Sequence, residues 1–134
     1  MQLTLHTDLA LRLLIAVTRS GEIPVALPGF SAAHRVSYNH VAKVGQALVH
    51  AGYLRSVRGR SGGMKLAMPP EDIRIGHVVR KMEPTMQMAD CPNCVINRDC
   101  SLISPLDEAK RAFLDVLDRQ TLADVARSTR SVAA

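Results

Sequence analysis

A turn of glycine and arginine near the middle of the chain constrains the fold more than any other feature. It separates two short segments, residues 53–57 and 64–67, and reads Arg58-Gly59-Arg60-Ser61-Gly62-Gly63. The first segment alternates apolar and polar side chains as a strand does, and the second is also short and strand-like. The pattern predicts a β-hairpin with a basic tip. Helical spacing dominates elsewhere, so the sequence predicts a chain that is mainly α with a small β-hairpin.

Two short helices are expected directly before the hairpin. The first covers residues 29–35. The second opens at Ser37, a residue favoured as an N-cap, and ends at Ala51-Gly52 after the apolar stripe Val41, Val44, Leu48 and Val49. Two short helices at a tight junction are typical of a helix-turn-helix, and a basic hairpin behind them is typical of a winged helix.

Further helices are expected on both sides of this unit. An amphipathic helix over residues 7–19 takes Thr7 as its cap and holds Asp8 in its first turn. Another covers residues 75–82, and a last short one covers residues 121–126. We therefore divide the chain into a winged helix-turn-helix DNA-binding domain over residues 1–83, a cysteine loop over 84–103, and a dimerisation helix and tail over 104–134, with residues 128–134 expected to be frayed.

A heptad seam marks the long C-terminal helix, which is expected to start with Ser104 as the cap and Pro105 in its first turn. The apolar residues step by four, three, four and three positions along Leu102, Leu106, Ala109, Phe113 and Val116. Such seams pair helices, and this one is long for so small a domain. We therefore expect a homodimer, with packing onto the chain's own core as the alternative.

The positive charge of the chain is concentrated in one segment. The net charge is +5, yet residues 23–70 contain six lysines or arginines and no acidic residue. A basic segment of this kind is typical of a phosphate-binding surface, and a solvated positive face is the alternative. Only 3% of the residues are aromatic, which argues against a binder that stacks single-stranded bases on rings. Double-stranded DNA is the expected partner.

The residues expected to contact DNA lie in two places. The N-terminal turn of a recognition helix meets base edges in the major groove, and arginines on a glycine-rich loop fit the minor groove. Asn39 and His40 can hydrogen-bond bases, whereas a solvated surface without a ligand is their alternative. The full predicted set is Ser37, Tyr38, Asn39, His40, Lys43, Arg58, Arg60 and Ser61.

The chain has three cysteines, and all lie within ten residues at Cys91, Cys94 and Cys100. The opening Met1-Gln2-Leu3-Thr4 lacks the cationic start of a secretory signal, and no segment reaches the ~20 apolar residues that span a bilayer. We therefore expect a cytoplasmic protein without membrane contact, whose thiols stay reduced.

Reduced thiols in such a cluster suit several roles. An iron–sulfur cluster of the 4Fe–4S or 2Fe–2S type is favoured over structural zinc, a thiol switch between Cys91 and Cys94, and inert thiols. Either metal centre usually takes four protein ligands. A carboxylate is the expected fourth ligand, because no histidine follows His77.

The Cys91–Cys94 spacing also matches the C-x-x-C motif of thioredoxin-like oxidoreductases. That chemistry needs the first cysteine at a helix N-terminus after a strand. Here the pair follows a helix and a loop, and no βαβ pattern is present. The sequence therefore does not predict an enzyme.

A set of motifs is spread along nearly the whole chain, to about Ala126. It comprises Met1-Gln2-Leu3-Thr4 with Thr7-Asp8, residues 36–40, 51–53, 57–63 and 73–76, Val78-Val79, Glu83-Pro84, the three cysteines, and residues 121–124. Together these motifs resemble the bacterial winged-helix iron–sulfur repressors, a family that includes NsrR, IscR and RirA. The opening with Asp8, the 37–40 turn and the 75–80 segment are most similar to the nitric-oxide-responsive NsrR group.

The resemblance implies a homodimeric repressor that binds a palindromic operator and senses nitric oxide through its cluster. It also implies that the fourth ligand is Asp8 of the partner subunit and that Arg12 holds this carboxylate. Members similar to IscR or RirA sense iron or redox status instead. A zinc-stabilised DNA-binding or interaction module is the remaining alternative.

Two features depart from the family pattern. Only two residues separate Cys91 from Cys94, fewer than is usual, which leaves the nuclearity of the cluster open. His77 stands where an acidic residue is common.

Overall fold

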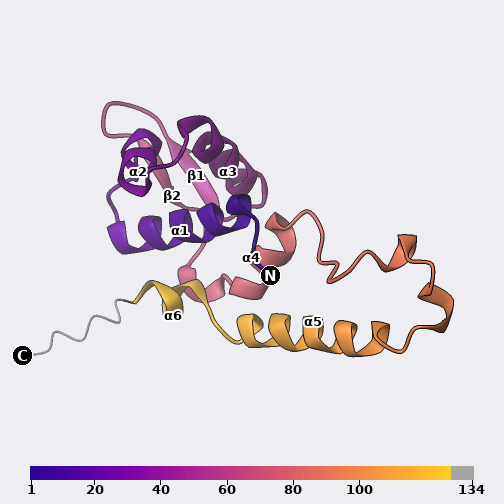
Figure 1. The fold of residues 1–134 in the computed structure, drawn as a ribbon. Coiled ribbons are helices and arrows are strands. Elements are labelled where there is room, and N and C mark those ends of the chain that lie inside the picture. Colours follow the sequence, from indigo (N-terminus) through magenta and orange to yellow (C-terminus); the bar gives the residue numbers. More distant parts are fainter. Residues whose placement is uncertain (128–134) are drawn as a thin grey trace, which may run out of the picture.

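A computed structural model describes residues 1–127 as a mainly helical chain with one small sheet, as predicted. The elements in chain order are α1 (Leu5–Ser20), α2 (Leu27–His34), α3 (Tyr38–His50), β1 (Leu54–Val57), β2 (Gly63–Leu66), α4 (Ile75–Met82), α5 (Ile103–Asp118) and α6 (Leu122–Ala126), with short 3-10 turns at Pro70–Asp72, Cys91–Asn93 and Asn97–Asp99. In Figure 1, α1 lies between α2, α3 and the hairpin on one side and α4, α5 and α6 on the other. Among the described residues, no helix has the length and apolar character needed to cross a bilayer.

α1 forms the centre of the hydrophobic core. Its apolar residues recur at helical spacing, so one face of the helix is buried against α3, α4, α6 and β2. The fully or almost fully buried side chains on this face are Leu9, Leu13, Leu14 and Val17. Burying each of them contributes roughly 1.5–3 kcal/mol. α1 therefore connects the helix-turn-helix and hairpin with the C-terminal helices.

The start of α1 differs from the prediction. The N-cap is Thr4, whose Oγ1 accepts a hydrogen bond from the backbone N–H of Thr7 at 3.3 Å. Thr7 lies inside the helix and is fully buried, so it is not the cap. Asp8 lies in the first turn as expected, and Gly21 ends the helix.

The helix-turn-helix and the wing form as predicted, with shifted bounds. α2 begins at Leu27 rather than at residue 29, because Pro28 occupies its first turn, where proline is favoured. Ser37 is the N-cap position of α3, although its side chain makes no capping hydrogen bond. β1 and β2 pair antiparallel. Backbone hydrogen bonds of 2.9 and 2.8 Å between Val25 and Met64 attach the hairpin to the segment before α2.

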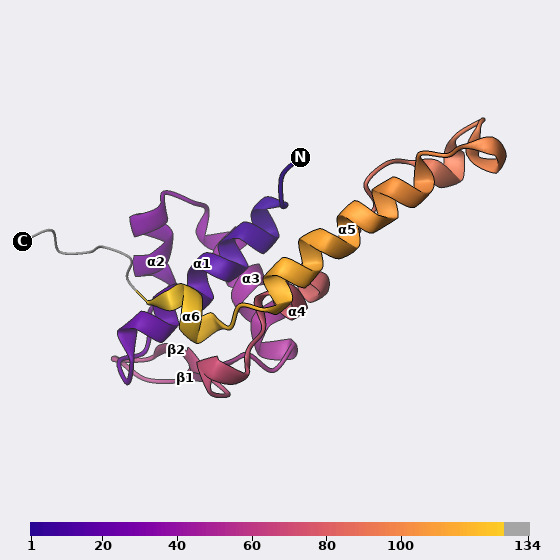
Figure 2. The same ribbon diagram turned by 90° about the horizontal axis from the view of Figure 1, so that it is seen from below.

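α5 extends away from the body of the protein as an arm (Figure 2). It begins at Ile103 with Leu102 at the N-cap position, so Ser104 lies in the first turn and is not the cap. Leu114 is its one buried residue, whereas Leu102 and Val116 of the heptad seam are 58% and 51% exposed. In the single chain, the seam is therefore only partly covered by the chain's own core.

α6 follows α5 and returns to the body. Thr121 caps it through a capping box with Asp124, which places the short helix where it was expected. The tail over residues 128–134, expected to be frayed, lies outside the described residues.

The C-terminal end of α5 is fixed to α4. Arg80 Nη1 and Nη2 donate hydrogen bonds to Asp118 Oδ1 and Oδ2 at 2.6 and 2.9 Å, and these bonds hold the pKa of Asp118 below its usual value. Gly76 lies under the same carboxylate. A Cβ atom at position 76 would be 1.8 Å from Asp118 Oδ1, so any larger residue there must displace the Asp118 carboxylate.

We expect Gly76→Ala to lower the free energy of unfolding by about 1–3 kcal/mol, because the new methyl group must displace Asp118 from Arg80. Urea unfolding followed by circular dichroism measures the change. Gly29→Ala is the matched control, since a Cβ atom there meets nothing within 4 Å. Equal stability of the two variants would contradict the close α4–α5 contact.

Candidate nucleic-acid interface and metal centre

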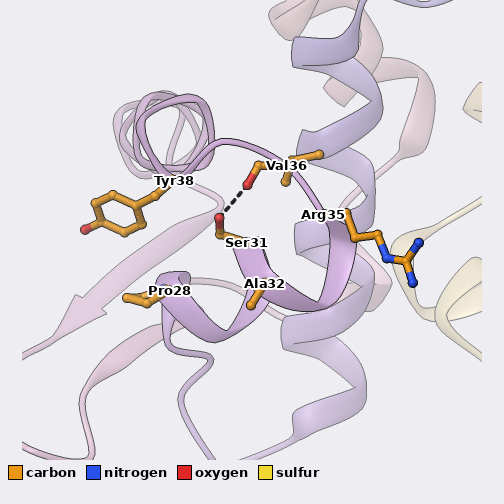
Figure 3. Close-up of a pocket in the computed structure, with 6 residues that line it drawn as sticks. All are labelled: Pro28, Ser31, Ala32, Arg35, Val36 and Tyr38. Carbon is orange, nitrogen blue, oxygen red and sulfur yellow. Dashed lines mark hydrogen bonds between the residues drawn. The ribbon is translucent and has the colours of Figure 1, made fainter.

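The turn between α2 and α3 is held by a side-chain hydrogen bond. Ser31 Oγ donates to the backbone oxygen of Val36 at 2.6 Å (Figure 3). Arg35 caps α2 in the left-handed conformation with φ of 54°, which is uncommon for a residue with a side chain. The chain therefore reverses within three residues, and the position of α3 relative to α2 is fixed.

The first turn of α3 presents polar side chains to solvent. Val41, Val44 and Leu48 on the opposite face are fully buried, so the helix can lie in only one rotational position. Ser37, Asn39 and Lys43 are exposed, His40 is half-buried, and Tyr38 is 50% exposed. Tyr38 and Arg35 lie on opposite sides of a shallow pocket of about 570 Å³ at the turn (Figure 3).

The wing presents the second group of predicted DNA contacts. Arg58, Arg60 and Ser61 are exposed in the β1–β2 turn. A Cβ atom at Gly62 would lie 2.2 Å from the backbone oxygen of Val57, so the tight turn that carries the arginines requires glycine there.

Most cations of the basic segment keep their charge available. Lys65 pairs with Glu22 at 2.8 Å. Within residues 1–127, no ion pair engages Arg35, Lys43, Arg58 or Arg60. Arg35 was counted in the basic segment but was not predicted to face DNA, because its place beside the recognition helix depends on the left-handed turn. The positive surface at the helix and wing is thus not neutralised by the described residues.

The three cysteines lie in the loop between α4 and α5, outside regular helices. Two 3-10 turns shape this part of the loop, with backbone hydrogen bonds such as Cys94 N to Cys91 O at 3.1 Å and Asp99 N to Ile96 O at 3.0 Å. Cys94 is exposed, Cys91 and Cys100 are partly buried, and all three thiols are free. Three soft thiolates suit an iron–sulfur cluster or zinc in donor type.

The single chain does not assemble a metal centre. Among residues 1–127, no three histidine, cysteine, aspartate or glutamate side chains gather closely enough to hold a metal ion. The cysteine loop reaches the far end of α5 (Figures 1 and 2), whereas Asp8 lies in the first turn of α1. The donor atoms are therefore of the right type for such a centre. Within one chain, however, the three thiols are not close to one another, and Asp8 is not close to them.

Asp8 is held by Arg12 one turn along α1. Arg12 Nε and Nη2 donate to Asp8 Oδ1 and Oδ2 at 2.9 and 2.5 Å, and both side chains are about two-fifths exposed. A carboxylate has about four acceptor sites on its two oxygens. Asp8 can thus stay bonded to Arg12 and still accept a further partner from outside the chain.

Two contacts near this site were not predicted. The Glu83 carboxylate accepts hydrogen bonds from Thr4 and Thr7, and the ring of His6 stacks on that of His40. These partners are too far apart in the sequence for any local pattern to pair them. Glu83-Pro84 does belong to the motifs of the family resemblance, which was the one available signal.

Comparison with known proteins identifies the family. Residues 3–128 match Rrf2, described as an iron-dependent transcriptional regulator. The chain belongs to the Rrf2 family. The HTH-type transcriptional regulator NsrR of Bacillus subtilis (strain 168) is 40% identical over 139 residues, which cover 98% of this chain and 94% of that protein. NsrR of Geobacillus kaustophilus (strain HTA426) is 38% identical over 138 residues, with the same coverage.

Solved structures agree on the fold. The oxidised form of Staphylococcus aureus CymR superposes with a TM-score of 0.82 at 24% identity and covers 98% of this chain and 100% of that one. T. potens IscR gives a TM-score of 0.79 at 24% identity, over 100% of this chain and 92% of that one. The protein is thus an NsrR-like Rrf2 transcriptional regulator with this fold, and the expectation that it is not an enzyme is confirmed by its relatives.

The exposure of the three thiols predicts their order of reaction. In the metal-free, reduced Rrf2 protein, iodoacetamide should alkylate Cys94 severalfold faster than Cys91 or Cys100, because Cys94 is exposed whereas the other two are partly buried. Tandem mass spectrometry of peptides quantifies each site over time. In urea the three rates should converge, and equal rates in the folded protein would contradict the described loop.

Proposed function

We propose that the protein is a homodimeric repressor that binds a palindromic DNA operator and senses nitric oxide through an iron–sulfur cluster. The observation that carries this proposal is the 40% identity to NsrR over 98% of the chain. The thiol-rich loop at the end of the α5 arm supports it independently. IscR-like or RirA-like sensing of iron or redox status is the second candidate, favoured by the family description as iron-dependent.

DNA reading is assigned to α3 and the wing. We assign base-edge contacts to Asn39 and His40 in the first turn of α3, and phosphate contacts to Lys43 and Ser37. Arg58, Arg60 and Ser61 approach the duplex from the wing. Two such heads in a dimer would read half-sites about one helical turn apart.

The homodimer is assigned to α5. Leu102 and Val116 are more than half exposed in the single chain, and a second copy of the same seam would cover them. The helix has 16 residues and is therefore about 24 Å long. An arm of this length carries the cysteine loop away from its own Asp8, which supports a site shared between two chains.

The sensor is assigned to Cys91, Cys94 and Cys100 with Asp8 of the partner subunit. When bound, an iron–sulfur cluster would supply iron that nitric oxide can ligate. The chain itself links the cluster to the recognition helix, since Asp8 lies in the first turn of α1 and α1 packs against α3. What holds Asp8 therefore affects where α3 lies.

Anaerobically purified protein should show visible charge-transfer absorption and acid-labile sulfide. A nitric-oxide donor should change the spectrum and weaken operator binding by about 5–150-fold, the usual range of coupling between two sites. Loss of operator affinity on iron chelation alone would instead favour iron sensing. Colourless protein without sulfide, or one zinc per chain, would rule out the cluster.

Cys100→Ala separates a sensor from a structural zinc site. If the loop is a sensor, the variant keeps the urea midpoint of the wild type but loses colour and the response to nitric oxide. If the metal is structural, the variant unfolds at a much lower urea concentration, because metal binding then supplies folding free energy.

The wing makes a separate prediction about salt. Replacing Arg58 and Arg60 by alanine should reduce the slope of log affinity against log salt by about 1.8 per chain, since each phosphate contact contributes about 0.9. Arg111→Ala, on the exposed side of α5, is the matched control and should leave the slope unchanged. Electrophoretic mobility shifts at several salt concentrations measure it, and an unchanged slope in the double variant would remove the wing from the interface.

A further inference from the structure

The first turn of α1 is fastened to the end of α4 by one carboxylate. Glu83 accepts hydrogen bonds from the backbone N–H of Thr4 at 3.2 Å, from Thr4 Oγ1 at 2.5 Å and from Thr7 Oγ1. Glu83 is the C-cap of α4 and the last residue before the cysteine loop. The loop therefore begins at a residue that is bonded directly to α1.

This attachment is strong for a partly exposed contact. Hydrogen bonds to an ionised acceptor are shorter and stronger than neutral ones. Partial burial raises the pKa of Glu83, but the hydrogen bonds from Thr4 and Thr7 outweigh it, so the pKa lies below its usual value and the side chain is ionised at neutral pH. Thr7 is fully buried, so its hydroxyl cannot replace the hydrogen bond to Glu83 with one to bulk water.

The same turn of α1 contacts the recognition helix. His6 lies between the two threonines, and its ring stacks on that of His40 with centroids 6.3 Å apart and planes inclined by 20°. His40 lies in the first turn of α3. Residues 4–7, the N-cap and start of α1, thus contact Glu83 on one side and the first turn of α3 on the other.

We propose that Glu83 is a positioning residue for DNA reading. It fixes the first turn of α1 through Thr4 and Thr7, and His6 passes that position on to His40 and the N-terminal turn of α3. This link runs within one subunit and is distinct from the one through Asp8 of the partner subunit. It rests on the proposed function, because it requires that α3 reads base sequence.

Two sets of variants of the full chain test the link. Glu83→Gln keeps the size of the side chain but removes its charge, and Thr7→Val keeps the buried shape but removes the hydroxyl. Thr7→Ser, which restores the hydroxyl, and Glu71→Gln, an exposed carboxylate elsewhere, are the controls. The operator is first selected by the wild type from random-sequence DNA. Dissociation constants are then measured for that operator, for a copy with one half-site base pair changed, and for unrelated DNA.

Glu83→Gln and Thr7→Val should reduce discrimination against the changed base pair by about tenfold, as expected when one base contact is misplaced. Affinity for unrelated DNA should stay unchanged, because the phosphate-contacting cations are intact. Thr7→Ser and Glu71→Gln should behave as the wild type. His6→Ala should cause a similar loss, and adding it to Glu83→Gln should cause little more, because residues in one chain of contacts are not additive.

The outcomes separate this inference from the proposed function. If the wild type selects no sequence from random DNA, the proposed function fails, and the inference fails with it. If the wild type selects an operator but Glu83→Gln and Thr7→Val discriminate as well as it does, the inference alone is overturned. It is also overturned if the variants lose affinity for all DNA equally, in step with a lower urea midpoint, since Glu83 then only stabilises the fold.

Discussion

The burial of one face of α1 is the interaction on which the rest of the structure depends. Leu9, Leu13 and Leu14 are inaccessible to solvent. The helix contacts α3 and β2 of the reading unit, which comprises α2, α3 and the β1–β2 hairpin, and it also contacts α4 and α6. Figure 1 shows α1 between these two parts. A displacement of α1 therefore alters the reading unit and the C-terminal helices together, and its first turn, which carries Asp8, is where the sensor is proposed to act.

The C-terminal arm, α5, differs from α1 in how much of its surface is buried. α5 buries little of its own surface and is attached near its C-terminal end, where Leu114 enters the core and Asp118 meets Arg80. An isolated helix of this length is only marginally stable in water. The exposed seam and the anchored end suit a helix that gains most of its packing from a second chain, which agrees with the dimer proposed for it.

Local chemistry predicted much of the fold. The apolar stripes of α1 and α3, the glycine-rich wing and the bounds of α4 follow from spacing within a few residues. The prediction of Thr7 as the cap of α1 was wrong, because a second threonine one turn earlier, Thr4, takes that position and Thr7 is buried inside the helix. The prediction of Ser104 as a cap was wrong because α5 starts at Ile103, two residues before the expected first helical residue Pro105, so Ser104 lies inside the first turn.

The candidate site was predictable in its residue types but not in its contacts. The cysteines by their clustering predict metal binding, and the wing arginines predict DNA contact, from the sequence alone. The bonds of Glu83 and the stacking of His6 on His40 join residues brought together only by the tertiary fold, and no period or motif encodes such pairs.

The two ends of the cysteine loop are attached to the body in different ways. One end is bonded straight onto the body at Glu83. The other end is joined to α5, which is about 24 Å long and meets the body at the Asp118 contact. A rotation of α5 by about 5° about that contact would move its far end by about 2 Å. A displacement at the tip therefore corresponds to only a small rotation where α5 meets the body, whereas the other end of the loop is joined directly to the start of α1 through Glu83.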